Sequence, residues 1–129
     1  MFRVTPVIRA TQLKSRAYGN IKLITKSPFN KYAGTGGAAL IAAGDGLVTI
    51  RSKSLLREFR LSLLLRSGEL QLQAYDGEVL VDTAVAMAAS GKQTVFVRAD
   101  RFDKVLIQVP ARAVIYSMCW LEVDRKSVV

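Results

Sequence analysis

The sequence predicts an α+β domain, with a mostly antiparallel, strongly twisted or barrel-like sheet and one or two short helices. Apolar and polar side chains alternate with a period of two through much of the chain. From Ser67 onward, turn residues recur about every ten positions, as they do in an antiparallel meander. One segment after Asp100 instead has helical spacing. The 129 residues have the size of one domain, and no linker or internal repeat divides them. We therefore expect a single domain over residues 1–129.

The alternation predicts strands that each have one apolar face. These strands cover residues 47–53, 57–66, 69–75, 78–86 and 94–98. Asp76 and Gly77 suit the two positive φ angles of a tight hairpin turn. A last strand over residues 112–124 is apolar on both faces, which is typical of a central strand covered on both sides or by a partner chain.

A helix is expected after Asp100, which is a suitable N-cap, with Asp103 completing a box-like cap. The apolar positions with helical spacing are Phe102, Val105, Leu106 and Val109. Pro110 ends this segment.

The start of the chain has a weaker pattern. Strands are expected at Phe2–Arg9 and Asn20–Lys26, and a short helix at Thr11–Ala17. Ser27–Gly37 is rich in Gly, Ser, Pro and Asn, so we expect a loop there.

The N-terminal half carries the excess positive charge. Residues 1–66 contain twelve Lys and Arg side chains against two acids, whereas residues 67–129 contain seven against eight. A one-sided positive field attracts polyanions before any specific contact forms. Nucleic acid is therefore the first partner class that the sequence favours.

The composition excludes several chemistries. The chain has no histidine and a single cysteine, Cys119, so Cys/His zinc sites and Ser-His or Cys-His catalysis are excluded. We expect no metal and no cofactor. Cys119 is expected to be a small buried apolar side chain, and a single cysteine fits a reducing, cytoplasmic location. No stretch reaches the roughly 18–20 apolar residues of a membrane-spanning helix.

The predicted nucleic-acid site combines basic strand faces with one loop. Arg51 and Lys53 share one strand face, and two further arginines share the polar face of the next strand. Aromatic side chains beside Lys31 offer stacking platforms for single-stranded bases. The predicted site comprises Lys22, Lys26, Phe29, Lys31, Tyr32, Arg51, Lys53, Arg60 and Arg66. The alternatives are a solvated face for the basic residues and ordinary packing for the aromatic ones.

Residues 63–110 resemble part of a bacterial sliding-clamp domain. The matching segments are LLLRSGELQLQAYDGEVLVDT and TVFVRADRFDKVLIQVP, in which strands and an Asp-bearing turn lead to a short helix closed by proline. The resemblance implies that Arg101 and Lys104 on this helix face DNA. It covers under half of the chain, and the first sixty residues do not follow the clamp pattern.

The sequence thus predicts a non-enzymatic nucleic-acid-binding protein that makes mainly phosphate contacts. The alternative is a homo-oligomeric assembly or protein-interaction module, because Leu64 and both faces of residues 112–124 require cover. A catalytic role is the third interpretation, and the sequence offers no catalytic residue for it.

Overall fold

The computed structural model describes residues 2–4, 8–9, 16–18, 21–25, 29–34, 37–42 and 45–123. Side chains are described for residues 45–123 and for Ile21, Lys22 and Ile24. All regular structure in these residues is β-strand, so the expected α+β class was wrong and the protein is all-β. None of the described residues belongs to a helix long and apolar enough to cross a membrane.

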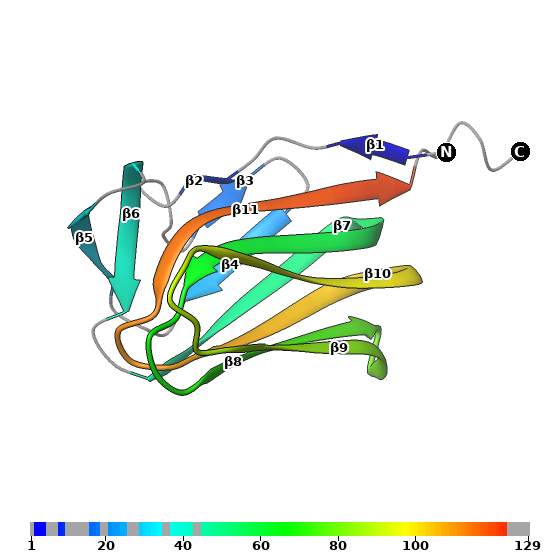
Figure 1. The fold of residues 1–129 in the computed structure, drawn as a ribbon. Coiled ribbons are helices and arrows are strands. Elements are labelled where there is room, and N and C mark those ends of the chain that lie inside the picture. Colours follow the sequence, from blue (N-terminus) through cyan, green and yellow to red (C-terminus); the bar gives the residue numbers. More distant parts are fainter. Residues whose placement is uncertain are drawn as a thin grey trace, which may run out of the picture.

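Eleven strands are described, and they form one folded sheet in which every described pairing is antiparallel (Figure 1). They are β1 (Phe2–Val4), β2 (Ile8–Arg9), β3 (Arg16–Tyr18), β4 (Ile21–Thr25), β5 (Phe29–Gly34), β6 (Gly37–Ala42), β7 (Gly46–Leu64), β8 (Glu69–Asp76), β9 (Val79–Met87), β10 (Gln93–Val109) and β11 (Val114–Val123).

Two long strands, β7 and β10, create the architecture because both turn back on themselves (Figure 1). Their mutual pairing shifts register between Arg98 and Phe102 and again between Phe102 and Lys104. Extra residues at such irregularities bend a strand, and strands that change layer form the corners of sandwiches. The first layer holds β6, β11, the C-terminal half of β7 and the N-terminal half of β10. The second layer holds β4, the other halves of β7 and β10, β8 and β9.

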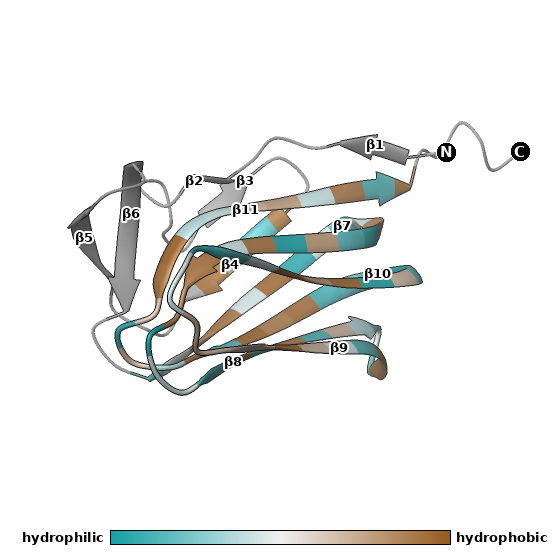
Figure 2. Ribbon diagram, viewed as in Figure 1, coloured by the Kyte–Doolittle hydropathy of each residue, from teal (hydrophilic) through white to brown (hydrophobic). Residues whose placement is uncertain are grey.

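The core lies between these layers. The apolar faces predicted for residues 47–53, 57–66 and 69–75 are confirmed, since their inward side chains all belong to one buried cluster. Figure 2 shows the resulting alternation of hydrophobic and hydrophilic residues along the strands. The largest fully buried side chains are Phe59, Phe102, Ile21, Ile50, Leu56, Leu61, Leu63, Leu65, Leu70, Leu72 and Ile107.

The helix expected after Asp100 is replaced by the C-terminal half of β10. Val105, Ile107 and Val109 are buried with a period of two, and this segment pairs with β7 on one side and β8 on the other. Asp103 does not cap a helix: its Oδ1 atom accepts a hydrogen bond of 3.0 Å from the backbone N–H of Gly77. A bend at Phe102 interrupts the period of two in this strand, and the apolar residues from Phe102 to Val109 therefore resemble a helical pattern.

The start of the chain is also more extended than expected. Phe29–Gly34 is strand β5, not a loop, and pairs with β6. The part of the expected helix at residues 16–17 belongs to β3, while residues 11–15 lie outside the described residues. Strands β1, β2 and β4 fall within the predicted strands Phe2–Arg9 and Asn20–Lys26.

Strand β11 confirms the central strand expected over residues 112–124, because it pairs with β7 on one side and with β6, β1 and β2 on the other. A register shift between Ile115 and Ser117 places Met118 on the core side. Tyr116 instead packs with Leu64 on the outer side. Leu64 is thus covered within its own chain, and its position gives no support to an oligomer.

The β8–β9 hairpin turns at Gly77 and Glu78, one position later than expected, because Asp76 pairs with Val79. Only Gly77 has a positive φ, at 64°. A positive φ at the first central residue alone is typical of a type II′ turn.

Replacing Gly77 with alanine should therefore lower the free energy of unfolding by about 1–2 kcal/mol, because a Cβ disfavours the left-handed region. Nothing lies within 4 Å of the added Cβ, so the cost comes from the backbone alone. Urea unfolding measures it. The control is Gly91→Ala, which has equal space and no positive φ; equal losses in both variants would contradict this explanation.

Candidate functional site

The outer face of the second layer collects amide, hydroxyl and basic side chains from five strands. Directly paired residues of antiparallel strands point to the same side of a sheet, so register defines this surface. Its cross-strand rows are Leu47, Gln108, Gln71 and Val85; then Ile24, Thr49, Leu106, Gln73 and Thr83; then Lys22, Arg51, Lys104 and Tyr75. All of these side chains are exposed or half-buried. We call this surface the amide face.

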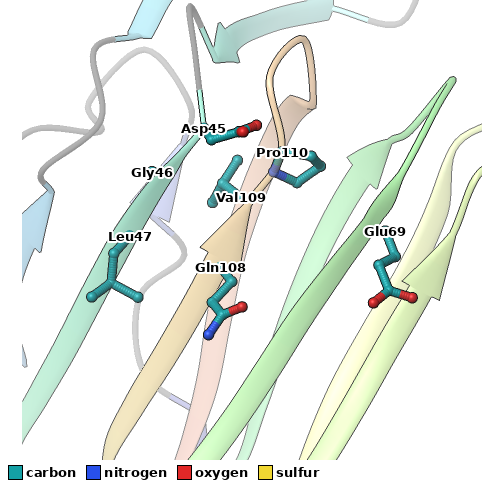
Figure 3. A pocket seen from close by; sticks show the side chains of 7 residues that line it. All are labelled: Asp45, Gly46, Leu47, Glu69, Gln108, Val109 and Pro110. Carbon is teal, nitrogen blue, oxygen red and sulfur yellow. The ribbon is translucent and has the colours of Figure 1, made fainter.

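The amide face ends in a hollow of about 440 Å³. Figure 3 shows Leu47, Gln108 and Glu69 projecting from three neighbouring strands, with Asp45 and Pro110 beyond the strand ends. The lining residues are Asp45, Gly46, Leu47, Glu69, Gln108, Val109 and Pro110. The volume lies in the range of about 300–1,000 Å³ that is common for ligand pockets.

Hydrogen bonds hold the walls of the hollow. The Oδ1 atom of Asp45 accepts a bond of 2.8 Å from the backbone N–H of Ala111, which ties the start of β7 to the turn after β10. In that turn the N–H of Ala113 donates to the carbonyl of Pro110 at 3.2 Å, and Arg112 has a φ of 69°. A positive φ at a residue other than glycine is uncommon, and here it accompanies the reversal that keeps Pro110 at the rim.

The middle of the face is organised by side chains that contact one another. Gln71 donates through Nε2 to Glu69 Oε1 at 3.2 Å, and the Tyr75 hydroxyl donates to Gln73 Oε1 at 3.4 Å. The ammonium of Lys104 lies 4.7 Å from the centre of the Tyr75 ring, a cation–π geometry. The aromatic ring is therefore held in place at the basic end of the face.

This arrangement suits an extended polyhydroxylated ligand. Carboxylates at the hollow accept hydrogen bonds, and glutamine amides both donate and accept them. Leu47 and Pro110 supply apolar surface for C–H groups. No group of three His, Cys, Asp or Glu side chains that could hold a metal ion occurs in the described part of the chain.

The predicted basic residues are divided between the two layers. Lys22 and Arg51 are paired on the amide face, and Lys53 is exposed two residues further along β7. Arg60 lies on the other half of β7, where it pairs with β11 and Phe96 of β10, on the outer face of the first layer. The bend in β7 separates these groups, so they do not form one basic face.

The remaining predicted site residues do not add to either group of basic side chains. Arg66 is exposed just beyond β7. Phe29, Lys31 and Tyr32 lie in β5, but the structure describes no side chain there, and Lys26 lies outside the described residues.

Sequence reasoning missed the glutamines and the hollow. The alternation around Gln71 and Gln73 identified a polar strand face but not its neighbours. Gln108 was assigned to a helix, so its pairing with Gln71 and Leu47 emerged only from strand register.

Comparisons with known proteins define the class of fold. No protein-family model matches the chain, and no curated protein matches it. A solved family 29 carbohydrate-binding module is similar over 99% of this chain and 98% of its own, with 13% identity and a TM-score of 0.54. The module CsCBM6-3 from Clostridium stercorarium, solved in complex with cellobiose, is similar over 89% and 92%, with 9% identity and a TM-score of 0.54.

A point variant of the family 29 module CBM29-2 has 14% identity and a TM-score of 0.54 over 97% of this chain and 99% of its own. The chain therefore has the β-sandwich fold found in carbohydrate-binding modules. At these identities the likeness concerns the fold.

The expected resemblance to a sliding-clamp domain was wrong, because the chain shares its fold with carbohydrate-binding modules. Its implied DNA-facing helix is strand β10, in which Arg101 pairs with Asp76 through a 3.1 Å ion pair. The prediction of nucleic-acid binding was wrong as well, because it relied on a single basic face. The fold is the one found in carbohydrate-binding modules, and the basic residues are divided between the two layers. The homo-oligomer alternative has no support either, and the cytoplasmic location stays a prediction.

Proposed function

We propose that the protein is a carbohydrate-binding module and that the amide face with its hollow is the sugar-binding surface. The observation that carries this proposal is the hollow beside the Gln71–Gln108 pair. There, two carboxylates, two amides and an apolar wall meet at the end of an open sheet face. The fold shared with carbohydrate-binding modules supports the assignment.

The chemistry of the surface matches that of a sugar chain. Each sugar hydroxyl both donates and accepts hydrogen bonds, so it is complementary to carboxylate and amide groups placed side by side. The C–H faces of a pyranose ring suit Leu47 and Pro110 at the hollow and the half-buried Tyr75 further along. The open sheet face between these two places suits a chain of several sugar units.

Soluble β-glucan oligosaccharides are the first ligands to test, because similar modules were solved with cellobiose and with cellulohexaose. The variant is Gln71→Ala/Gln108→Ala, which removes both amides from one cross-strand row. We expect about a tenfold or greater loss of affinity for cellulohexaose, equivalent to about 1.4 kcal/mol or more. Isothermal titration calorimetry measures it.

Gln93→Ala is the matched control. This glutamine lies at the start of β10, away from the amide face, and donates to the carbonyl of Met87 at 2.8 Å. Its substitution should leave sugar affinity within about twofold, well below the tenfold step of about 1.4 kcal/mol. Equal losses in both variants would place the sugar elsewhere on the molecule. Failure of the unmodified protein to bind any member of a panel of neutral polysaccharides would overturn the proposed function.

A further inference from the structure

A second hollow lies on the opposite side of the sandwich, on the outer face of the first layer. It has a volume of about 270 Å³ and is lined by Arg57, Glu58, Arg60, Arg98 and Leu121. We call it the arginine pocket. Strand register builds it, because Glu58 of β7 pairs with Arg98 of β10 on one side and with Leu121 of β11 on the other.

Glu58 fixes two of these arginines. Its side chain is 5% exposed. Its Oε2 accepts from Arg60 Nε at 2.6 Å, and its Oε1 accepts from Arg98 Nε at 2.9 Å and Nη2 at 2.6 Å. Burial raises the pKa of Glu58, but the hydrogen bonds and charges of Arg60 and Arg98 outweigh it and hold the pKa below its usual value. The carboxylate is therefore ionised at neutral pH, and both guanidinium groups are held in one orientation.

The arginines keep donors that Glu58 does not use. A guanidinium has five N–H groups, and the Nη atoms of Arg60 have no hydrogen-bond partner among the described residues. The Arg60 and Arg98 side chains are 48% and 62% exposed. Arg60 and Arg98 share the single carboxylate of Glu58, so this trio carries a net positive charge. Asp82 lies close by, with its Oδ2 accepting from the backbone N–H of Arg98 at 2.8 Å.

An exposed aromatic ring borders the same arginines. Phe96 is 44% exposed, and the guanidinium carbons of Arg60 and Arg98 lie 5.8 and 5.2 Å from its ring centre. Leu121 adds an apolar wall. Pre-oriented guanidinium groups bind carboxylates through paired, charge-assisted hydrogen bonds, while the ring and Leu121 suit the apolar face of a group attached to that carboxylate.

We propose that the arginine pocket binds the carboxylate of an acidic sugar residue, a hexuronate, with the pyranose ring against Phe96. This is a second binding site, separate from the amide face. The choice of a sugar as carrier of the carboxylate rests on the proposed function, whereas the anion site rests on the pocket.

Cys119 provides a reporter for the pocket. It is the only cysteine in the chain, it is half-buried, and it is paired with Arg60 across β11 and β7. Burial raises the pKa of its thiol, while the nearby Arg60 acts in the opposite direction, so alkylation by iodoacetamide is followed at mildly alkaline pH. A carboxylate bound at Arg60 covers the thiol and disfavours the thiolate, and both effects slow alkylation.

The test compares alkylation rates of the full chain with glucuronate, galacturonate, their neutral methyl esters, benzoate and sulfate. We expect saturable protection by at least one uronate and none by its ester. Protection by benzoate or sulfate without protection by either uronate would overturn the assignment to a sugar. No protection by any of these anions would overturn the anion site. Cellulohexaose titrations of the same samples report on the amide face separately.

Substitutions in the arginine pocket test whether uronate protection of Cys119 depends on this pocket. Arg60→Gln should weaken uronate protection about tenfold or more, because it removes a charge-assisted partner. The matched control is Arg66→Gln. Arg66 lies outside the pocket, so uronate should protect Cys119 in this variant as well as it does in the unmodified protein. If Arg60→Gln does not fold, Phe96→Ala leaves every ion pair in place and should still weaken protection by uronate. Unchanged protection in the folded variants would refute the proposed location.

Discussion

Replacing Phe102 with alanine is expected to lower the free energy of unfolding by about 3–5 kcal/mol, the usual cost of removing a large buried aromatic side chain. Phe102 is fully buried and pairs with Leu56 at the corner where β7 and β10 pass between layers. The register shifts on both sides of it leave this position with little alternative packing. A cavity there weakens the contact between the layers as well as the local strand. Urea unfolding followed by tryptophan fluorescence measures the loss.

Phe96→Ala in the same strand is the matched control. Its ring is 44% exposed and lies beside the guanidinium groups of Arg60 and Arg98, so its loss should cost about 1.5 kcal/mol or less. If Phe102→Ala does not fold, Phe102→Leu keeps most of the buried volume and should show an intermediate loss. A cost at Phe102 no greater than that at Phe96 would contradict the position of the corner.

The second large effect is expected from Arg60→Ala/Arg98→Ala, which leaves the buried carboxylate of Glu58 without these partners. Removing one side of a buried ion pair commonly costs about 3–5 kcal/mol. We expect about 3 kcal/mol at neutral pH, the lower end of that range, because both arginines are partly exposed and water reaches the vacated pocket.

This loss should depend on pH. In the unmodified protein the pKa of Glu58 is lowered in the folded state. Its contribution to stability is therefore present above the pKa of the unfolded chain and is lost as pH falls through the folded-state pKa. In the double variant burial remains and raises the pKa, so protonation relieves the penalty as pH falls. The difference in stability should thus begin to shrink above about 4.3, the ordinary pKa of glutamate, where the carboxyl of the double variant becomes protonated. It should shrink further below that pH, where the unmodified protein loses its stabilising ion pairs.

Urea midpoints of both proteins across this pH range measure the effect. Arg101→Ala is the control, because its 3.1 Å ion pair with Asp76 is exposed and should contribute about 1 kcal/mol or less. A stability difference between the double variant and the unmodified protein that stays constant with pH would show that Glu58 is not its source.

The alternation of residues predicted the inward faces of β7 and β8 well, but not that of β9, where Val79, Val81 and Val85 are exposed. Val48, Ile50, Phe59, Leu61 and Leu63 all point into the core as expected. Side chains of a strand alternate in direction whatever the strand pairs with, so a local pattern carries this information. For the same reason the polar side of Gln71 and Gln73 was recognisable.

The segment after Asp100 shows where local pattern fails. Phe102, Val105 and Val109 fit helical spacing, while Val105, Ile107 and Val109 equally fit a strand. Pairing with β7 and β8 decided between them, and the bend at Phe102 disturbed the period that would have identified the strand. The resemblance to a sliding clamp included this helix, and the helix is a strand in the structure.

The amino-acid sequence was sufficient to define which side chains of each central strand face the core, because side-chain direction is local. Apart from the β8–β9 hairpin, it did not define which strands are neighbours, since register and bends depend on contacts between distant segments. The pairing of Gln108 with Gln71 built the amide face, and the bend in β7 carried Arg60 away from Arg51 to the opposite side of the sandwich. The candidate sites are products of that long-range pairing.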